Sequence, residues 1–199
     1  MSETGSVKFK CDQVAVKTIP FDGMAELNEH RRKLQQLGLI GVDASGIGYG
    51  NLSIRDGTTN KFYITGSMTG GKPALDLADY ARVVSYDFRR NWLRCEGSTI
   101  ASSESLTHAA VYESEPKAGA VIHCHDLKLW KGRPVEIPAT PEAVDYGTPE
   151  MVQEVRRLFE NTDVKSRKIF MMAGHEGGFV TFGRDLEDAY AVLMKHLEA

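Results

Sequence analysis

The chain has 199 residues, of which 42% are hydrophobic and 26% are charged, and its formal net charge is −3. A chain of this length and composition is expected to fold as a single domain around one core. The negative net charge and the lack of a basic cluster argue against a nucleic-acid or anionic-membrane partner. No apolar run is as long as a membrane span, and the first residues lack the pattern of a signal peptide, so we expect a cytoplasmic protein. Three widely spaced cysteines, Cys11, Cys95 and Cys124, are expected to be free thiols.

Hydrophobic periodicity predicts helices and strands in alternation, without an internal repeat or a linker. A helix over residues 24–37 is expected to end at Gly38, because glycine is the usual residue after a helix end. The other predicted helices cover residues 103–113, 149–161 and 185–198, and the predicted strands cover residues 52–55, 61–65, 82–86, 121–125, 168–173 and 179–182. Short strands joined as hairpins between helices predict an α/β fold with a mostly antiparallel or mixed sheet.

Two histidines lie one residue apart in the apolar run 121–125. On a strand, His123 and His125 point to the same face, whereas Cys124 points to the opposite face. Two imidazoles on one face form half of a zinc site. By itself, this spacing also fits two polar residues on a solvated face.

Ser102, Ser103 and Glu104 stand where the helix over 103–113 begins. Serines at a helix start can cap the helix, and the free backbone N–H groups there attract anions such as phosphate. Glu104 has two interpretations: a carboxylate that interacts favourably with the helix dipole, or a general acid/base beside a metal. His108, four residues later, is interpreted as a core or supporting histidine rather than as a ligand.

A zinc site with an open position needs a third protein ligand. The candidate is His175, which follows an apolar strand within the glycine-rich stretch 174–178. A histidine in such a loop also fits a simple surface position. His30 and His196 lie in charge-rich helices and are expected to face solvent.

The order of these features along the chain resembles that of the class II aldolase/adducin family. The features are Ser102-Ser103-Glu104, a helix, His123-x-His125, and a distant His175 before a final helix. This family includes fuculose- and rhamnulose-phosphate aldolases, ribulose-phosphate 4-epimerases and a methylthioribulose-phosphate dehydratase. Further segments that resemble the family are Gly50-Asn51-Leu52-Ser53, Ile64-Thr65-Gly66-Ser67, Tyr146-Gly147-Thr148-Pro149-Glu150 and Phe182-Gly183-Arg184-Asp185-Leu186-Glu187-Asp188-Ala189. The resemblance begins near residue 25, so we expect one domain over residues 1–199 with residues 1–20 as an N-terminal extension.

The resemblance implies a three-layer αβα fold and a homotetramer with active sites between subunits. It also implies a sugar-phosphate-like substrate and a zinc ion, although three imidazoles also admit other divalent metals. The implied zinc ligands are His123, His125 and His175, and the implied catalytic acid/base is Glu104. The implied residues for binding substrate phosphate are Asn51, Ser67, Ser102 and Ser103.

Two departures from the family pattern concern the substrate side of the site. Met68 stands where the family usually has glycine, in a loop where the backbone approaches the phosphate. The stretch 126–146 is shorter than in sugar-phosphate aldolases, where it carries a tyrosine that serves the leaving aldehyde. Tyr146 is the nearest tyrosine here, and for it we favour a structural role before the next helix.

The implied activity is that of a zinc-dependent aldolase, a lyase that cleaves or forms a C–C bond in a ketose phosphate or related hydroxy-carbonyl compound through a metal-stabilised enediolate. The alternatives are a sugar-phosphate dehydratase or epimerase with the same metal site, or a non-catalytic adducin-like interaction module. The epimerase branch has aspartate where Glu104 stands. Adducin-like domains lack the full histidine set that this chain retains.

Overall fold

A single mixed sheet of eight strands forms the centre of the computed structural model, which describes residues 7–197. The strand order is β1-β7-β6-β5-β4-β8-β10-β9, and only β1 and β7 pair in parallel. The strands of this sheet are β1 (Lys10–Val14), β4 (Asn51–Arg55), β5 (Phe62–Thr65), β6 (Tyr80–Asp87), β7 (Trp92–Glu96), β8 (Ala120–His125), β9 (Ile169–Met171) and β10 (Gly178–Gly183). A separate two-stranded hairpin consists of β2 (Gly41–Val42) and β3 (Gly48–Tyr49). The predicted mixed, mostly antiparallel sheet is confirmed.

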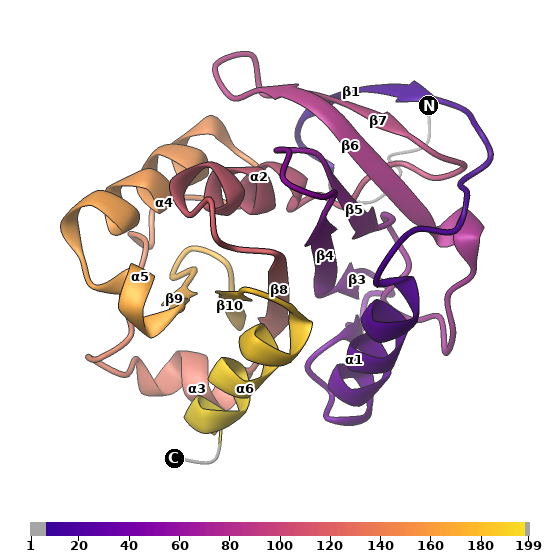
Figure 1. Ribbon diagram of the computed structural model, residues 1–199. Coiled ribbons are helices and arrows are strands. Elements are labelled where there is room, and N and C mark those ends of the chain that lie inside the picture. The colour runs from indigo at the N-terminus through magenta and orange to yellow at the C-terminus, as the bar shows by residue number, and fades with distance from the viewer. Residues whose placement is uncertain (1–6, 198–199) are drawn as a thin grey trace.

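Helices cover both faces of the sheet and produce the expected three layers (Figure 1). They are α1 (Met24–Gln36), α2 (Ser105–Ser114), α3 (Leu127–Gly132), α4 (Pro149–Asn161), α5 (Val164–Arg167) and α6 (Leu186–Leu197), with a 3₁₀ turn at Leu77–Asp79. One core lies under α2 and α4, and the other lies under α1 and α6. Strand β8 contributes to both, because Val121 enters the first core and Ile122 and Cys124 enter the second.

Local signals place the helix ends where the sequence predicts them. Helix α1 stops before Gly38, whose φ is +73°, and the Leu39 N–H donates to the Leu34 carbonyl across that turn. Helix α4 begins after Thr148, whose hydroxyl accepts from the Met151 N–H, and Pro149 occupies the first turn. Residue 198, the last of the predicted final helix, lies outside the described residues.

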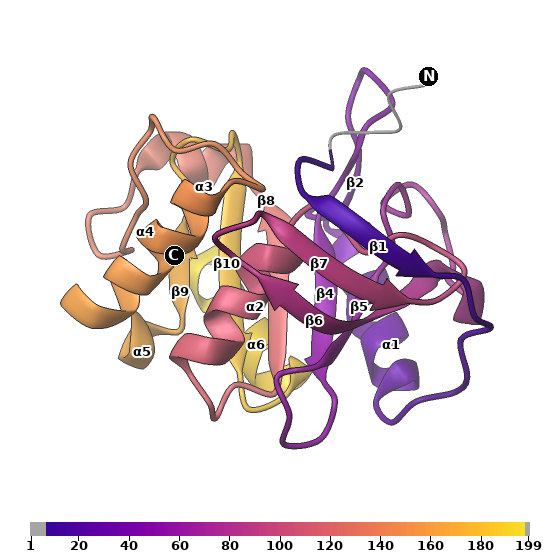
Figure 2. The ribbon, with the colours of Figure 1, turned by 90° about the horizontal axis from the view of Figure 1, so that it is seen from above.

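Part of the expected N-terminal extension belongs to the sheet. Strand β1 runs along the outer edge of β7, at the opposite end of the sheet from β9 (Figure 2). Neither β1 nor β7 is predicted from the sequence. Residues 1–6 of the expected extension lie outside the described part of the chain.

The prediction that His30 faces solvent is wrong. Its side chain is only 3% exposed, because α1 packs against α6. The His30 Nε2 atom lies 3.1 Å from a Glu187 carboxylate oxygen, and its Nδ1 atom lies 3.0 Å from the Glu26 carbonyl oxygen. His196 is partly buried.

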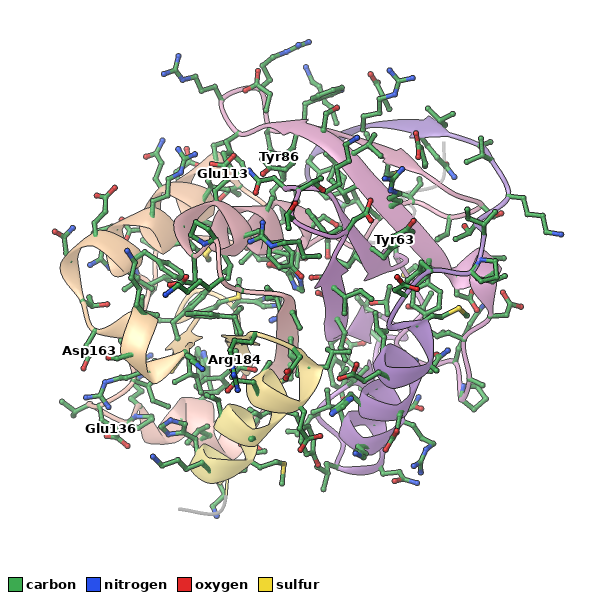
Figure 3. All side chains as sticks on the ribbon, in the orientation of Figure 1. Tyr63, Tyr86, Glu113, Glu136, Asp163 and Arg184 are labelled. Atoms are coloured by element: carbon green, nitrogen blue, oxygen red, sulfur yellow. The ribbon has the colours of Figure 1, made fainter. Side chains whose placement is uncertain are left out.

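Charged side chains cover the outside of the molecule. Glu136 and Asp163, for example, point away from its body (Figure 3). The three cysteines are free thiols, as expected. Within residues 7–197, the helices are too short or too polar to cross a bilayer.

The left-handed backbone at Gly38 leads to a stability prediction. An added Cβ has open space at both Gly38 and Gly132, but only Gly38 has a positive φ. We expect Gly38→Ala to lower the free energy of unfolding by about 1 kcal/mol and Tm by about 2–4 °C. The matched variant Gly132→Ala is expected to lose no stability. Equal Tm values for the two variants in thermal unfolding would contradict the assigned role of φ.

Candidate active site

The candidate site lies at one end of the sheet, where three strands and a helix meet. The β-sheet register places His123 of β8 beside Asn51 of β4 and Val180 of β10, and His125 beside Gly178. The loop before β10 carries His175, and Glu104 lies at the start of α2. Residues that are distant in the sequence therefore converge because β8 is paired on both edges.

The three histidines present their Nε2 atoms to one point. The His125 Nε2 atom lies 3.2 Å from that of His123 and 3.0 Å from that of His175. Two nitrogens bound tetrahedrally to one zinc at about 2.0–2.1 Å lie roughly 3.3 Å apart. The spacing therefore fits a shared metal ion with only small adjustments.

Burial keeps these imidazoles in the neutral form that metals require. Desolvation lowers the pKa of His125 to about 4 and the pKa of His175 to about 3. It also lowers the pKa of His123 well below its ordinary value. The neutral imidazoles thus retain lone pairs for coordination near neutral pH.

A backbone hydrogen bond orients the most buried ligand. The His123 Nδ1–H donates to the Phe179 carbonyl at 3.1 Å. Because a carbonyl oxygen only accepts, this bond places the proton on Nδ1 and leaves the lone pair on Nε2, which faces the other two rings.

Glu104 supplies a buried carboxyl group to the same cavity. Its side chain is 2% exposed and makes no hydrogen bond that caps α2. The Thr107 hydroxyl donates to Oε2 at 2.8 Å, whereas Oε1 has no partner among the described residues. Desolvation is the main cause that raises the pKa of Glu104 to about 7, so the group exchanges a proton near neutral pH. This environment differs from that of a carboxylate that only favours the helix dipole.

Every site residue expected from the sequence lines one cavity of about 180 Å³. These residues are Asn51, Ser67, Ser102, Ser103, Glu104, His123, His125 and His175. Asn51 Oδ1 is buried without a protein partner among the described residues, so it remains available to a ligand. Met68, in the same lining, has a φ of +63°, so the loop keeps a backbone conformation typical of glycine although the residue is methionine.

His108 lies outside the converging group of ligands. Its Nδ1 atom lies 2.7 Å from the Ser53 hydroxyl, which is also 2.8 Å from the Tyr112 hydroxyl. This buried network packs under α2 and supports the interpretation of His108 as a core histidine.

Two tyrosines of the cavity wall were not assigned to the site from the sequence. The ring centroid of Tyr49 lies 5.1 Å from that of His125, and the ring centroid of Tyr146 lies 4.3 Å from that of His175. Tyr49 belongs to the glycine-rich stretch 46–50, which was the only sequence signal for it. For Tyr146, the sequence predicted a structural role before the next helix and did not predict this contact with the candidate ligand His175.

Comparisons with known proteins place the chain in a family and show which solved structures share its fold. The sequence profile described as Class II Aldolase and Adducin N-terminal domain matches residues 32–199. Among solved structures, the chain is similar to an L-fuculose 1-phosphate aldolase, with 19% identity, a TM-score of 0.63, and coverage of 91% of this chain and 84% of that chain. It is also similar to an L-fuculose-1-phosphate aldolase from Thermus thermophilus, with 22% identity, a TM-score of 0.61, and coverage of 87% of this chain and 88% of that chain.

A third similar structure is YgbL from Escherichia coli, a candidate aldolase/epimerase/decarboxylase, with 20% identity, a TM-score of 0.64, and coverage of 87% and 84%. At these identities, the structural similarities show a shared fold. The curated proteins include no significant match to the chain.

The desolvated carboxyl group predicts a pH dependence of stability in the metal-free protein. The pKa of Glu104 is raised from 4.5 to about 7 on folding, so its ionisation destabilises the fold as pH rises through that interval. Glu104→Gln does not ionise. We therefore expect the variant to gain up to about 3 kcal/mol of unfolding free energy over wild type between pH 4.5 and pH 8.

Denaturant unfolding at several pH values, with a chelator present, measures this difference. The exposed Glu160→Gln is the matched control and is expected to show no such gain. A difference between Glu104→Gln and wild type that stays constant with pH would refute the assigned desolvation.

Proposed function

Because the chain belongs to the class II aldolase and adducin family, we propose that it is a zinc-dependent lyase. The proposed reaction cleaves or forms a C–C bond in a ketose phosphate or a related hydroxy-carbonyl compound. The observation that carries the proposal is the convergence of three Nε2 atoms in a cavity that also contains a buried carboxyl group.

His123, His125 and His175 would hold the metal. Their neutral rings, short nitrogen separations and burial fit the three-histidine set of a catalytic zinc site with an open position. When bound, zinc supplies a Lewis acid to the carbonyl and neighbouring hydroxyl oxygens of the substrate. Three neutral ligands leave the full charge of the cation, which suits a reaction that develops negative charge on oxygen.

Glu104 would move the proton that the reaction requires. The free Oε1 atom is the position for this proton, while the Thr107 hydroxyl holds Oε2 in place. A carboxyl group whose pKa lies near 7 both accepts and returns a proton at neutral pH.

The polar residues of the cavity wall would hold the anionic end of the substrate. Ser67, Ser102 and Ser103 offer hydroxyl groups, and Asn51 offers an amide. Ser102 and Ser103 lie just before Glu104, the residue that precedes α2, and the N-terminal dipole of this helix attracts anions. These features support a phosphorylated substrate.

The alternative functions share parts of this site. A dehydratase or an epimerase would use the same metal and the same carboxyl group, so the product of the reaction decides among them. A purely adducin-like interaction module needs neither the three converging rings nor the desolvated carboxyl group.

We also propose that the chain forms a homo-oligomer, with a tetramer as the expected state. Apolar side chains are exposed near the mouth of the cavity, at Val42, Ile47 and Met68. A neighbouring subunit that covered them would exclude water from the site.

The metal site is tested by the zinc content of His123→Ala. We expect bound zinc per chain to fall by roughly tenfold or more, because this variant loses the most buried ligand. Elemental analysis after dialysis measures it, with His196→Ala as a control outside the cavity. A zinc content equal to that of wild type would show that the three histidines do not form the site.

The reaction is tested with zinc-loaded protein and a panel of phosphorylated and unphosphorylated ketoses, assayed for retro-aldol cleavage and dehydration. Glu104→Gln is expected to keep its zinc and to lower turnover by about 10²–10⁴-fold, because the proton-transfer group is lost. Glu160→Gln is expected to match wild type. Turnover retained in Glu104→Gln would refute the acid/base role, and a zinc-loaded wild type without turnover would refute the lyase.

A further inference from the structure

The side chain of the candidate ligand His175 is held in place by different interactions from those that hold His123. His123 is fixed by its hydrogen bond to a backbone carbonyl of β10. His175 lies in the loop between β9 and β10, and no carbonyl or carboxylate within residues 7–197 accepts a hydrogen bond from its ring. Its orientation therefore depends on packing.

Besides the other two candidate ligands, Gly178 and Tyr146 contribute to this packing. A Cβ atom on Gly178 would lie 2.8 Å from His175 Cδ2, so the imidazole occupies space that only glycine leaves free. Beside it, the Tyr146 ring lies with its centroid 4.3 Å from the imidazole centroid, at an interplanar angle of 45°. Tyr146 is thus the side chain other than the candidate ligands whose ring packs against the His175 ring.

The Tyr146 ring is itself held by the N-terminal segment. The Lys8 ammonium lies 3.8 Å from the centroid of the Tyr146 ring and forms an ion pair with Asp145. The Asn91 side-chain amide donates to the Lys8 carbonyl at 3.0 Å and to the Gly147 carbonyl at 3.2 Å. These bonds fasten the segment before β1 to the loop that carries Tyr146.

We infer that Tyr146 and Lys8 are positioning residues of the metal centre: the tyrosine ring holds His175 in its coordinating orientation, and the lysine holds the tyrosine ring. The inference rests on the proposed metal site. It assigns a role to a segment that precedes residues 32–199, the part matched by the family profile. A loop imidazole that is already ordered loses less side-chain entropy when it binds a metal, so support of this kind raises metal affinity.

The direction in which removal of Lys8 changes zinc affinity shows whether Lys8 acts by positioning Tyr146 or by its charge. Lys8 lies close enough to His175 for its charge to act on that ring. A positive charge near a cation site weakens cation binding, so its removal alone would tighten zinc binding. If Lys8 acts by positioning Tyr146, its removal weakens zinc binding instead.

The experiment measures the zinc dissociation constant by chelator competition and the Tm of the zinc-free protein. Tyr146→Leu is expected to weaken zinc binding by about tenfold, and Tyr146→Phe, which keeps the ring, is expected to match wild type. Lys8→Met is expected to weaken binding by about two- to fivefold, and Lys8→Arg to restore it. The double variant Lys8→Met/Tyr146→Leu is expected to bind zinc as Tyr146→Leu does, because the lysine acts through the ring.

The matched control is Lys10→Met, which removes an exposed lysine of β1 and is expected to leave zinc affinity unchanged. Zinc-free Lys8→Met should keep the Tm of wild type, because exposed charges contribute little to stability. Unchanged or tighter zinc binding in Lys8→Met, or additive losses in the double variant, would overturn the inference. If Tyr146→Leu does not fold, the comparison of Lys8→Met with Lys8→Arg decides.

These outcomes are independent of the lyase activity. A protein whose zinc affinity depends on Lys8 and Tyr146 but that cleaves no hydroxy-carbonyl compound would refute the proposed lyase and leave this inference standing. An active lyase whose zinc affinity does not change in the Lys8 and Tyr146 variants would support the proposed function and refute this inference.

Discussion

The pairing of β8 on both edges is the constraint on which the candidate site depends. Side chains of a fully paired strand must alternate between faces, so His123 and His125 share one face while Cys124 enters the opposite core. A shift of one residue would exchange the two faces and place the cysteine in the cavity. Because cores cover both faces of β8, that shift would place the polar imidazoles in an apolar core and would move Ile122 and Cys124 out of it. The packing of the fold therefore also fixes the position of two candidate ligands.

Desolvation then acts in opposite directions on the groups gathered at this end of the sheet. It lowers the pKa of the histidines, which favours neutral rings, and it raises the pKa of Glu104, which favours a bound proton near pH 7. One physical cause thus accounts both for the neutral form of the candidate metal ligands and for the raised pKa of the proposed proton-transfer group. This burial leaves two acceptor oxygens, Oε1 of Glu104 and Oδ1 of Asn51, without hydrogen-bond partners among the described residues, which is energetically unfavourable. Unpartnered acceptors in a lined cavity are the expected signature of a ligand site rather than of a core.

The sequence predicts the parts of the structure that are determined by residues close together in the sequence. Alternation along 121–125 predicts the shared face of the two histidines, and the positive φ of Gly38 and the cap at Thr148 agree with the helix ends inferred from residue type. Strand β7 was missed although its buried Leu93 and Cys95 alternate with charged residues. Strand β1 was missed because its partner β7 lies some 80 residues away along the chain and its own residues show no alternation of apolar and polar side chains. The burial of His30 was missed for the same reason, since it depends on α6. The convergence of His175 with β8 was implied by a family resemblance, and no local signal contains it.

The fold constrains the candidate metal ligands on strand β8 more strongly than it constrains the loops of the cavity wall. Two of the candidate ligands lie on a strand whose position is fixed by two cores, and a change there would disturb both. Met68 and the shortened stretch 126–146 lie in connections around the cavity, where a substitution alters the wall without moving the sheet. His175 belongs to this second category, because it lies in the loop between the end of β9 and the start of β10, which is held by hydrogen bonds with Thr140, Trp130 and Asp126 rather than by strand pairing. A third ligand on a loop therefore requires support from outside the sheet, and the contact of Tyr146 with the N-terminal segment is the structural feature that provides it.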